Sequence, residues 1–487
     1  MKKEEKEFKK YLESKGNFEN KDFSKIEGKV NLEQNFNIKK KRMSKPLKIV
    51  MASLICLLCV PIVCVSGIGL VYLSHSFSKE YKYVAKKVQY TLNDEKMYKD
   101  QSFKALNSIT YPQDRGDNEI DSSLINGLST FSYNLVKSDL NNSNYLISTL
   151  SAYFNLNIIS LLSSSNNVNE EFDFALQANK ETRSTELKKI LENNFYKNDY
   201  GTTQIYNSVF FNNQYELNNQ YVDILSKNYT EAYSMDFTYD NLDKIINWMK
   251  VRTSNQNSFS KDDFEFDESS IAYILSTLYF NNKWSYSFSE NSSFDSNFIN
   301  GEEKTKVRYM HHEYGSVYKQ TEDYFSFFDY YQNGYKIKYI ISNSYDISTL
   351  DALKNTNFVA TNVDDYKPCV INLDVPKMKY SYKKNIMSNI KSLGINTVFN
   401  KDEDNFPDLF ENTKDSQYIS FIKQSNTIEF DETGTIATSI TMSGMKSGSA
   451  APGGDDNTFF VKLDQPFAYV IYDQKNIPLF VGYYANK

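Results

Sequence analysis

Apolar and polar positions follow three different patterns along this chain, and each pattern predicts a different kind of structure. The first pattern is a run of 25 residues, from Ile49 to Leu73, that contains no charged residue. At about 1.5 Å of rise per residue, a helix of this length is long enough to span a bilayer. We therefore expect a transmembrane helix over residues 49–73, preceded by a polar tail (1–48) and followed by a polar extracellular spacer (74–121).

The second pattern begins after this spacer. Apolar residues recur at helical spacing at Leu124, Leu128 and Phe131, as they do on one face of an amphipathic helix. Further along the chain, β-branched and aromatic residues dominate segments such as 271–280, which is typical of strands. Helices that come first and strands that come later favour one α+β domain over residues 122–487.

The third pattern is an alternation of residues in the β-branched segment that begins at residue 435. One face of a strand formed there would carry only small side chains, at Thr435, Ala437, Ser439, Thr441 and Ser443. The residues that follow, up to Asp456, have the Gly, Ser and Pro content of a loop. We interpret this stretch as a segment that can exist either as a strand or as part of an exposed loop.

Charge indicates the direction of membrane insertion and excludes one class of partner. Basic residues cluster just before the apolar run, between Lys39 and Lys48. Because cytoplasmic flanks carry an excess of Lys and Arg, we expect the N-terminus in the cytoplasm and the large domain outside the plasma membrane. The net charge of −6 argues against binding to nucleic acid, whose phosphates attract a basic surface.

Residues that carry catalytic or metal chemistry are scarce. The chain has three histidines and four cysteines, and three of the cysteines lie inside the apolar run. The pair His311 and His312 has no second cluster to complete a zinc site, and nothing marks a serine that either histidine would activate. Phosphate-binding glycine loops and nucleophile elbows are missing from the sequence. We therefore expect no enzymatic activity, no metal and no cofactor.

Seven short motifs occur in a fixed order through the large domain. They are Ser148-Thr-Leu-Ser151, Ile246-Asn-Trp-Met249, Leu278-Tyr-Phe-Asn-Asn-Lys-Trp284, Val375-Pro-Lys-Met378, Leu393-Gly-Ile395 with Phe399, Asp431-Glu-Thr-Gly-Thr435 with Ala437, and Gln465-Pro-Phe467 with Pro478-Leu-Phe-Val-Gly482. In order and spacing they resemble the motifs of the serpins, along nearly the full length of that family's domain. The resemblance implies the serpin fold, with helices packed on a large central mixed β-sheet, two smaller sheets and an exposed reactive loop.

The resemblance also implies a function, which is inhibition of a serine protease by a suicide substrate. In this family the protease cleaves the exposed loop, which inserts as an extra strand into the central sheet and traps the acyl-enzyme. The hinge of this loop would comprise Glu432, Gly434, Thr435, Ala437 and Ser439. The face of the hinge that would enter the sheet carries no bulky, charged or Pro residue, so a working inhibitor is favoured.

Other family positions lie where the central strands part. By resemblance these positions are Ser148, Ser151, Ser276, Gln424, Trp284 and Lys306. Ser276 and Gln424 stand where the family often has Asn and His, and their polar side chains would allow a hydrogen bond to persist. Lys306 and Glu432 occupy positions that pair in some relatives, so we predict an ion pair between them.

The position of the cleaved bond is open among neighbouring alternatives. Lys446 is the only basic residue in the exposed part of the loop, and cleavage between Lys446 and Ser447 would suit a trypsin-like protease. Cleavage after Met445 would suit a chymotrypsin-like protease, and cleavage between Gly448 and Ser449 an elastase- or subtilisin-like one. The family's usual count along the loop ends on Gly448. We take the bond between Lys446 and Ser447 as the working prediction.

Two functions of other classes fit the same sequence. One is a non-inhibitory module of the same fold used for binding or adhesion, and the other is a trap directed at cysteine proteases. A covalent, SDS-resistant complex with a serine protease would distinguish the inhibitor from the binding module. We expect a monomer whose partners are a protease and the lipid bilayer around residues 49–73.

Overall fold

The computed structural model describes residues 103–254, 259–266, 270–344, 347–353, 355–413, 416–436 and 458–486. Its helices are α4 (Ser122–Val136), α5 (Thr149–Leu162), α6 (Asn166–Ala175), α7 (Lys180–Asn193), α8 (Asn219–Lys227), α9 (Leu242–Arg252), α10 (Thr349–Leu353) and α11 (Met387–Ser392). Within these ranges no helix is long and apolar enough to cross a bilayer. The transmembrane helix expected at 49–73 lies outside the described residues and stays a prediction.

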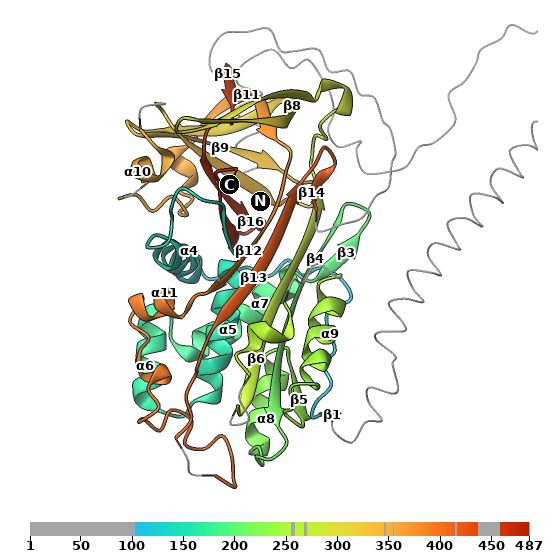
Figure 1. The fold of residues 1–487 in the computed structure, drawn as a ribbon, viewed down its shortest axis with the longest axis vertical. Coiled ribbons are helices and arrows are strands. Elements are labelled where there is room, and N and C mark those ends of the chain that lie inside the picture. The colour runs from blue at the N-terminus through green and yellow to red at the C-terminus, as the bar shows by residue number, and fades with distance from the viewer. Residues whose placement is uncertain are drawn as a thin grey trace, which may run out of the picture. The chain divides into compact units, whose positions relative to one another are not determined.

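The first sheet is mixed and has eight strands. Its strands are β1 (Phe103–Ala105), β3 (Tyr196–Asn198), β4 (Gly201–Asn212), β5 (Thr230–Met235), β6 (Ala272–Lys283), β12 (Met378–Asn385), β13 (Lys423–Phe430) and β14 (Gly434–Ile436). Their order is β1-β5-β4-β6-β14-β13-β12, with β3 paired to β4 off this path. β4 and β5 run parallel, and the other neighbours run antiparallel. Figure 1 shows β6 and β13 as long neighbouring strands, with the short β14 at one end of the space between them.

The second sheet has nine strands. Its strands are β2 (Tyr145–Ile147), β7 (Phe294–Asn300), β8 (Glu303–Gln320), β9 (Tyr324–Tyr330), β10 (Lys336–Ser342), β11 (Lys367–Pro376), β15 (Thr458–Lys462), β16 (Phe467–Tyr472) and β17 (Pro478–Tyr484). Their order is β15-β11-β8-β9-β10-β16-β17-β2, with β7 paired to β8. The two smaller sheets expected from the sequence are therefore joined into one. The cause is β8, which is 18 residues long and pairs with β7 and β11 as well as with β9.

The helix that supports the first sheet is α5. Its first residue follows Ser148, whose side chain accepts a hydrogen bond from the backbone N–H of Ser151 at 3.3 Å and so caps the helix. Nearly every residue of α5 is buried, because the helix lies between other helices and strands β6 and β17. The motif Ser148 to Ser151 thus lies at the start of α5.

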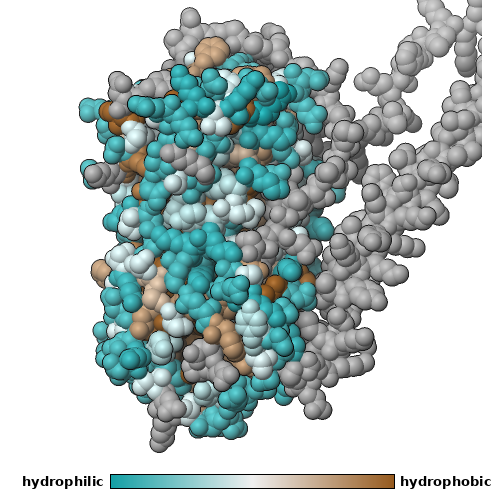
Figure 2. Space-filling view, in the orientation of Figure 1, coloured by the Kyte–Doolittle hydropathy of each residue, from teal (hydrophilic) through white to brown (hydrophobic). Residues whose placement is uncertain are grey.

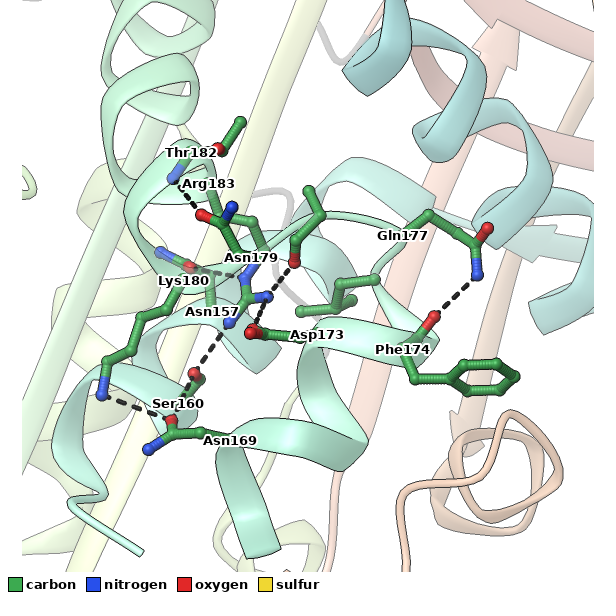
Figure 3. A network of polar contacts seen from close by, with 12 residues as sticks. Asn157, Ser160, Asn169, Asp173, Phe174, Gln177, Asn179, Lys180, Thr182 and Arg183 are labelled. Atoms are coloured by element: carbon green, nitrogen blue, oxygen red, sulfur yellow. Dashed lines mark hydrogen bonds and ion pairs between the residues drawn. The ribbon is translucent and has the colours of Figure 1, made fainter. Parts of the chain in front are cut away.

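A buried arginine ties α5 to the two helices that follow it (Figure 3). The guanidinium of Arg183 donates to Asn157 at 3.2 Å and to Ser160 at 2.9 Å, and it pairs with Asp173 at 2.5 Å. These partners offset the cost of burying the charge. Burial, and next the positive charge of Arg183, lower the pKa of nearby Lys180 to about 8.

Residues 103–121 belong to the folded unit, which differs from the polar spacer expected over residues 74–121. β1 adds an edge strand to the first sheet by pairing with β5, and the residues after it run on to α4. Two separated aromatic anchors, Phe103 and Tyr111, pack into the domain, and they have no periodic pattern that would have marked this segment as folded. On the face shown in Figure 2, the described residues are mostly hydrophilic, and apolar residues are scattered among them.

Candidate functional site

The candidate site is the place where a third strand enters between β6 and β13. Gly434 and Thr435 of β14 pair with Lys283 and Asn282 of β6, and Thr435 also pairs with Phe430 of β13. A side chain at residue 434 would put its Cβ only 2.3 Å from the carbonyl oxygen of Asn282. Only glycine therefore fits at residue 434, which gives the predicted hinge glycine a steric reason.

A tight turn made by Asp431 sends the chain from β13 into β14. Its carboxylate accepts hydrogen bonds from the backbone N–H groups of Thr433 at 2.8 Å and Gly434 at 3.0 Å. Trp284, which follows β6, donates from its indole N–H to the carbonyl of Asp431 at 2.9 Å. The same indole stacks on Tyr331 with 4.5 Å between ring centroids. The turn is thus stabilised by the carboxylate of Asp431 and by the indole of Trp284 before the loop begins.

Thr435 points into the protein, as its place on the small face predicts. It is 2% exposed, and its hydroxyl forms a 2.6 Å hydrogen bond with the hydroxyl of Tyr331. Neighbouring residues of a strand alternate between its faces, so this orientation sets the face of every residue that continues β14. Ala437 and Ser439, and the residues of the predicted cleavage region from Met445 to Ser449, lie outside the described residues.

Glu432 has a different partner from the one expected. Its carboxylate pairs with Nζ of Lys377 at 2.6 Å and accepts from the hydroxyl of Ser293 at 3.2 Å. Burial alone would raise the pKa of Glu432, but the hydrogen bond from Lys377 and further hydrogen bonds outweigh burial, and the pKa is lowered. The predicted ion pair between Lys306 and Glu432 is wrong, because β8 holds Lys306 opposite Asn297 in the hairpin with β7, where it is exposed.

A cavity of about 650 Å³ continues from β14 along the space between β6 and β13, which we call the β6–β13 gap. Ser276 and Leu278 of β6 line one side of it, and Gln424 and Asn426 of β13 line the other. Ser151 and neighbouring residues of α5 also line the cavity. The two strands are therefore parted beyond β14, with polar groups on both walls that a further strand would meet.

Among the described residues, Ser276 and Gln424 do not bond to each other across this gap. Gln424 instead exchanges two hydrogen bonds with the backbone of Ser148, at 2.9 and 3.2 Å, and thereby joins β13 to the start of α5. The hydroxyl of Ser276 is buried and has no hydrogen-bond partner in the described part of the chain. The hydrogen bond considered between Ser276 and Gln424 is absent there, because Gln424 is engaged by Ser148.

Sequence reasoning missed two residues of the site. Tyr331 receives Thr435, and Lys377 binds Glu432. Lys377 lies inside one of the seven motifs, so its motif was a signal, although nothing there indicates a carboxylate partner. Within the described residues no group of three or more His, Cys, Asp or Glu side chains is placed to hold a metal ion. His311, which was not expected to bind a metal, contacts the carboxylate of Asp374, and the neighbouring His312 contacts the carbonyl of Tyr286.

In this fold, a loop segment begins to enter between two strands of a large mixed sheet, which is the arrangement expected of a serpin. Comparison with protein-family models supports the same class. A model of the family described as serpin, serine protease inhibitor, matches residues 126–487. The chain therefore belongs to the serpin family.

Individual relatives are similar over most of this domain. A serine protease inhibitor from Cyanea capillata is 26% identical over 300 residues, which cover 58% of this chain and 75% of that protein. Serpin-Z10 of Arabidopsis thaliana is 24% identical over 360 residues, 70% of this chain and 91% of that protein. The native-state crystal structure of tengpin, a thermophilic serpin, matches with a TM-score of 0.68 at 24% identity, covering 79% of this chain and 100% of that one.

Proposed function

We propose that this serpin inhibits serine proteases as a suicide substrate. The observation that carries the proposal is β14, whose first residues already pair with both β6 and β13 above a cavity that extends between those strands. The start of the loop is thus held in register at the mouth of the site that the rest of the loop would fill.

The chemistry belongs to the protease, and the serpin supplies the bond. In the proposed reaction the serine Oγ of the protease attacks the carbonyl carbon of Lys446 and displaces the nitrogen of Ser447. The serine proton passes to that nitrogen, which leaves as a free amine, and Lys446 stays attached to the protease as an ester. Insertion of the loop before water hydrolyses this ester would trap the complex.

Continuing the register of β14 identifies which residues would meet inside the sheet. Each step forward from Thr435 is one step back along both β6 and β13, so the sixth residue after Thr435 falls opposite Ser276 and Gln424. That residue is Thr441, a member of the small face. Its hydroxyl would reach the hydroxyl of Ser276, which has no hydrogen-bond partner among the residues described for the intact form. The inserted strand would thereby satisfy a buried polar group that the intact state leaves unsatisfied.

Mixing the protein with trypsin, chymotrypsin or subtilisin tests the proposal. We expect a covalent complex with trypsin that survives SDS, and mass spectrometry of the released fragment should place the cut after Lys446. The variant Lys446→Ala should lose the trypsin complex, whereas the control Lys379→Ala, at an exposed lysine of β12, should retain it. Cleavage without any complex, and with no rise in melting temperature after cleavage, would favour the binding module instead.

We also propose that residues 49–73 anchor this inhibitor in the plasma membrane, with residues 1–48 in the cytoplasm. The support comes from the length of the apolar run and its basic N-terminal flank. Treating intact cells with a protease should remove the large domain while sparing an epitope tag on the N-terminus. Release of the full-length protein from membranes by alkaline carbonate would contradict this proposal.

A further inference from the structure

Residues 103–121, which we call the strap, precede the part of the chain that the family model matches and pack along the edge of the eight-stranded sheet. The strap begins with β1, which pairs with β5. Just past β1, the side chain of Asn107 accepts from the N–H of Ala232 at 2.8 Å and donates to the carbonyl of Thr230 at 3.0 Å. This side chain continues the hydrogen bonding to β5 where the strand itself has ended.

Tyr111 is the central anchor of the strap. Its ring stacks on Phe195 with 4.7 Å between centroids and meets the edge of Tyr206 at 5.0 Å. Its hydroxyl donates to Oε1 of Glu231 at 3.2 Å. Burial, and next the negative charge of Glu231, raise the pKa of Tyr111 well above its usual value, so the hydroxyl keeps its proton and remains a donor.

Glu231 is a buried carboxylate that joins the strap to α9. The indole N–H of Trp248 donates to its Oε2 at 2.6 Å, and the guanidinium of Arg252 pairs with its Oε1 at 2.6 Å. Both of these residues belong to α9. A buried carboxylate that loses donors becomes costly, so the position of α9 depends on Glu231 and on the groups that hold it, Tyr111 included.

α9 in turn covers part of the β6–β13 gap. Met249 of α9 and Thr253 just after it line the cavity, together with Phe259 and Phe264 from the segment that follows. α9 lies on the face of the sheet that carries Tyr273 of β6, opposite the face that packs on α5. A strand that enters the gap must pass these residues, so a contact that fixes α9 in place opposes entry.

The second half of the strap is fixed to the rest of the domain. The guanidinium of Arg115 donates to the carbonyl of Asn333, between β9 and β10, at 2.8 Å. Asp117 and Glu119 pair with Lys475, in the turn between β16 and β17, at 3.0 and 2.9 Å. The strap is therefore held to the first sheet near one end and to the turns of the second sheet near the other, with Tyr111 between them.

We propose that the strap, acting through Tyr111 and Glu231, holds α9 over the β6–β13 gap and slows insertion of the reactive loop. This inference rests on the proposed function, because only a serpin that inserts its loop has an insertion rate to control. The strap lengthens the lifetime of the uncleaved state, since contacts that must break before insertion raise its barrier.

Two substitutions of one residue test the strap in the full-length protein, kept in mild detergent. Tyr111→Phe removes only the hydroxyl, and Tyr111→Ala also removes the ring. The control Tyr200→Ala changes a tyrosine that is 53% exposed in the turn between β3 and β4. Hydrogen exchange of the α9 amides measures how firmly Tyr111 holds α9. Conversion of warmed, uncleaved protein to a denaturant-resistant inserted form measures the rate of loop insertion.

We expect conversion to be about tenfold faster in Tyr111→Ala, a few-fold faster in Tyr111→Phe and unchanged in the control, with faster α9 exchange in both Tyr111 variants. Unchanged α9 exchange in both variants would overturn the inference, and so would an unchanged conversion rate. Complex formation by the wild-type protein is measured separately. Its failure would count against the proposed inhibitory function, whereas the exchange data alone decide whether Tyr111 holds α9.

Discussion

Replacing Ser276 with alanine should shift the stabilities of the intact and cleaved forms in opposite directions. In the intact form the hydroxyl of Ser276 is buried without a hydrogen-bond partner among the described residues. Such a group costs about 1–3 kcal/mol, because it has lost its hydrogen bonds to water and gained none in return. Ser276→Ala should therefore raise the free energy of unfolding of the intact protein by that amount.

The cleaved form should respond in the opposite way. Continuing the register of β14 brings Thr441 beside Ser276, where the two hydroxyls can bond. Such a hydrogen bond contributes about 0.5–1.5 kcal/mol, and alanine at residue 276 removes it. The stability difference between the two forms should narrow by about 1.5–4.5 kcal/mol, the sum of these two effects.

Guanidinium unfolding of both forms measures these shifts. Ser208→Ala is a matched control, because the hydroxyl of Ser208 is also buried and has no partner in the described ranges. Ser208 lies on β4 opposite Leu275, on the other face of the sheet from Ser276. The substitution Ser208→Ala should stabilise the intact and the cleaved forms by the same amount. An intact Ser276→Ala protein that is less stable than wild type, or equal shifts in its two forms, would refute the reasoning.

Three further predictions follow from the contacts and charges of these residues. Thr435→Arg should yield cleaved serpin in place of complex on SDS gels, because a charged side chain does not fit a position that is 2% exposed. The lowered pKa of Glu432 contributes stability that is present above its usual value of 4.5 and is lost as the pH falls through the lowered value. Lys377→Met should flatten that loss in urea unfolding, and Lys306→Met should not. Because the pKa of Lys180 is lowered from 10.5 to about 8, stability should rise between these two pH values, and Lys180→Met should abolish the rise.

The sequence predicted those features that depend on local pattern. The inward face of Thr435 follows from alternation along a strand. The order of the motifs was enough to predict the α+β serpin fold, which the family match shows.

Features that depend on long-range placement could not be predicted in this way. Lys306 and Lys377 are both lysines in strand-rich sequence, and only the folded arrangement decides which of them reaches Glu432. Ser276 and Gln424 are both polar, but the competing backbone of Ser148 takes the glutamine. The strap escaped notice because Tyr111 is an isolated aromatic in a polar stretch, and its partners come from distant strands and helices.

The length of β6 sets how far a bound protease can travel. β14 enters opposite Lys283, and the register runs out at Ala272, where β6 begins. Counting along that register, Met445 is the last loop residue with a partner on β6. The strand pairing therefore ends just before Lys446. At about 3.3 Å per residue, a protease esterified to Lys446 would come to lie about 35 Å along the sheet from Thr435, roughly the diameter of a small domain. If β6 were shorter by one repeat of the pleat, the esterified protease would lie correspondingly closer to Thr435.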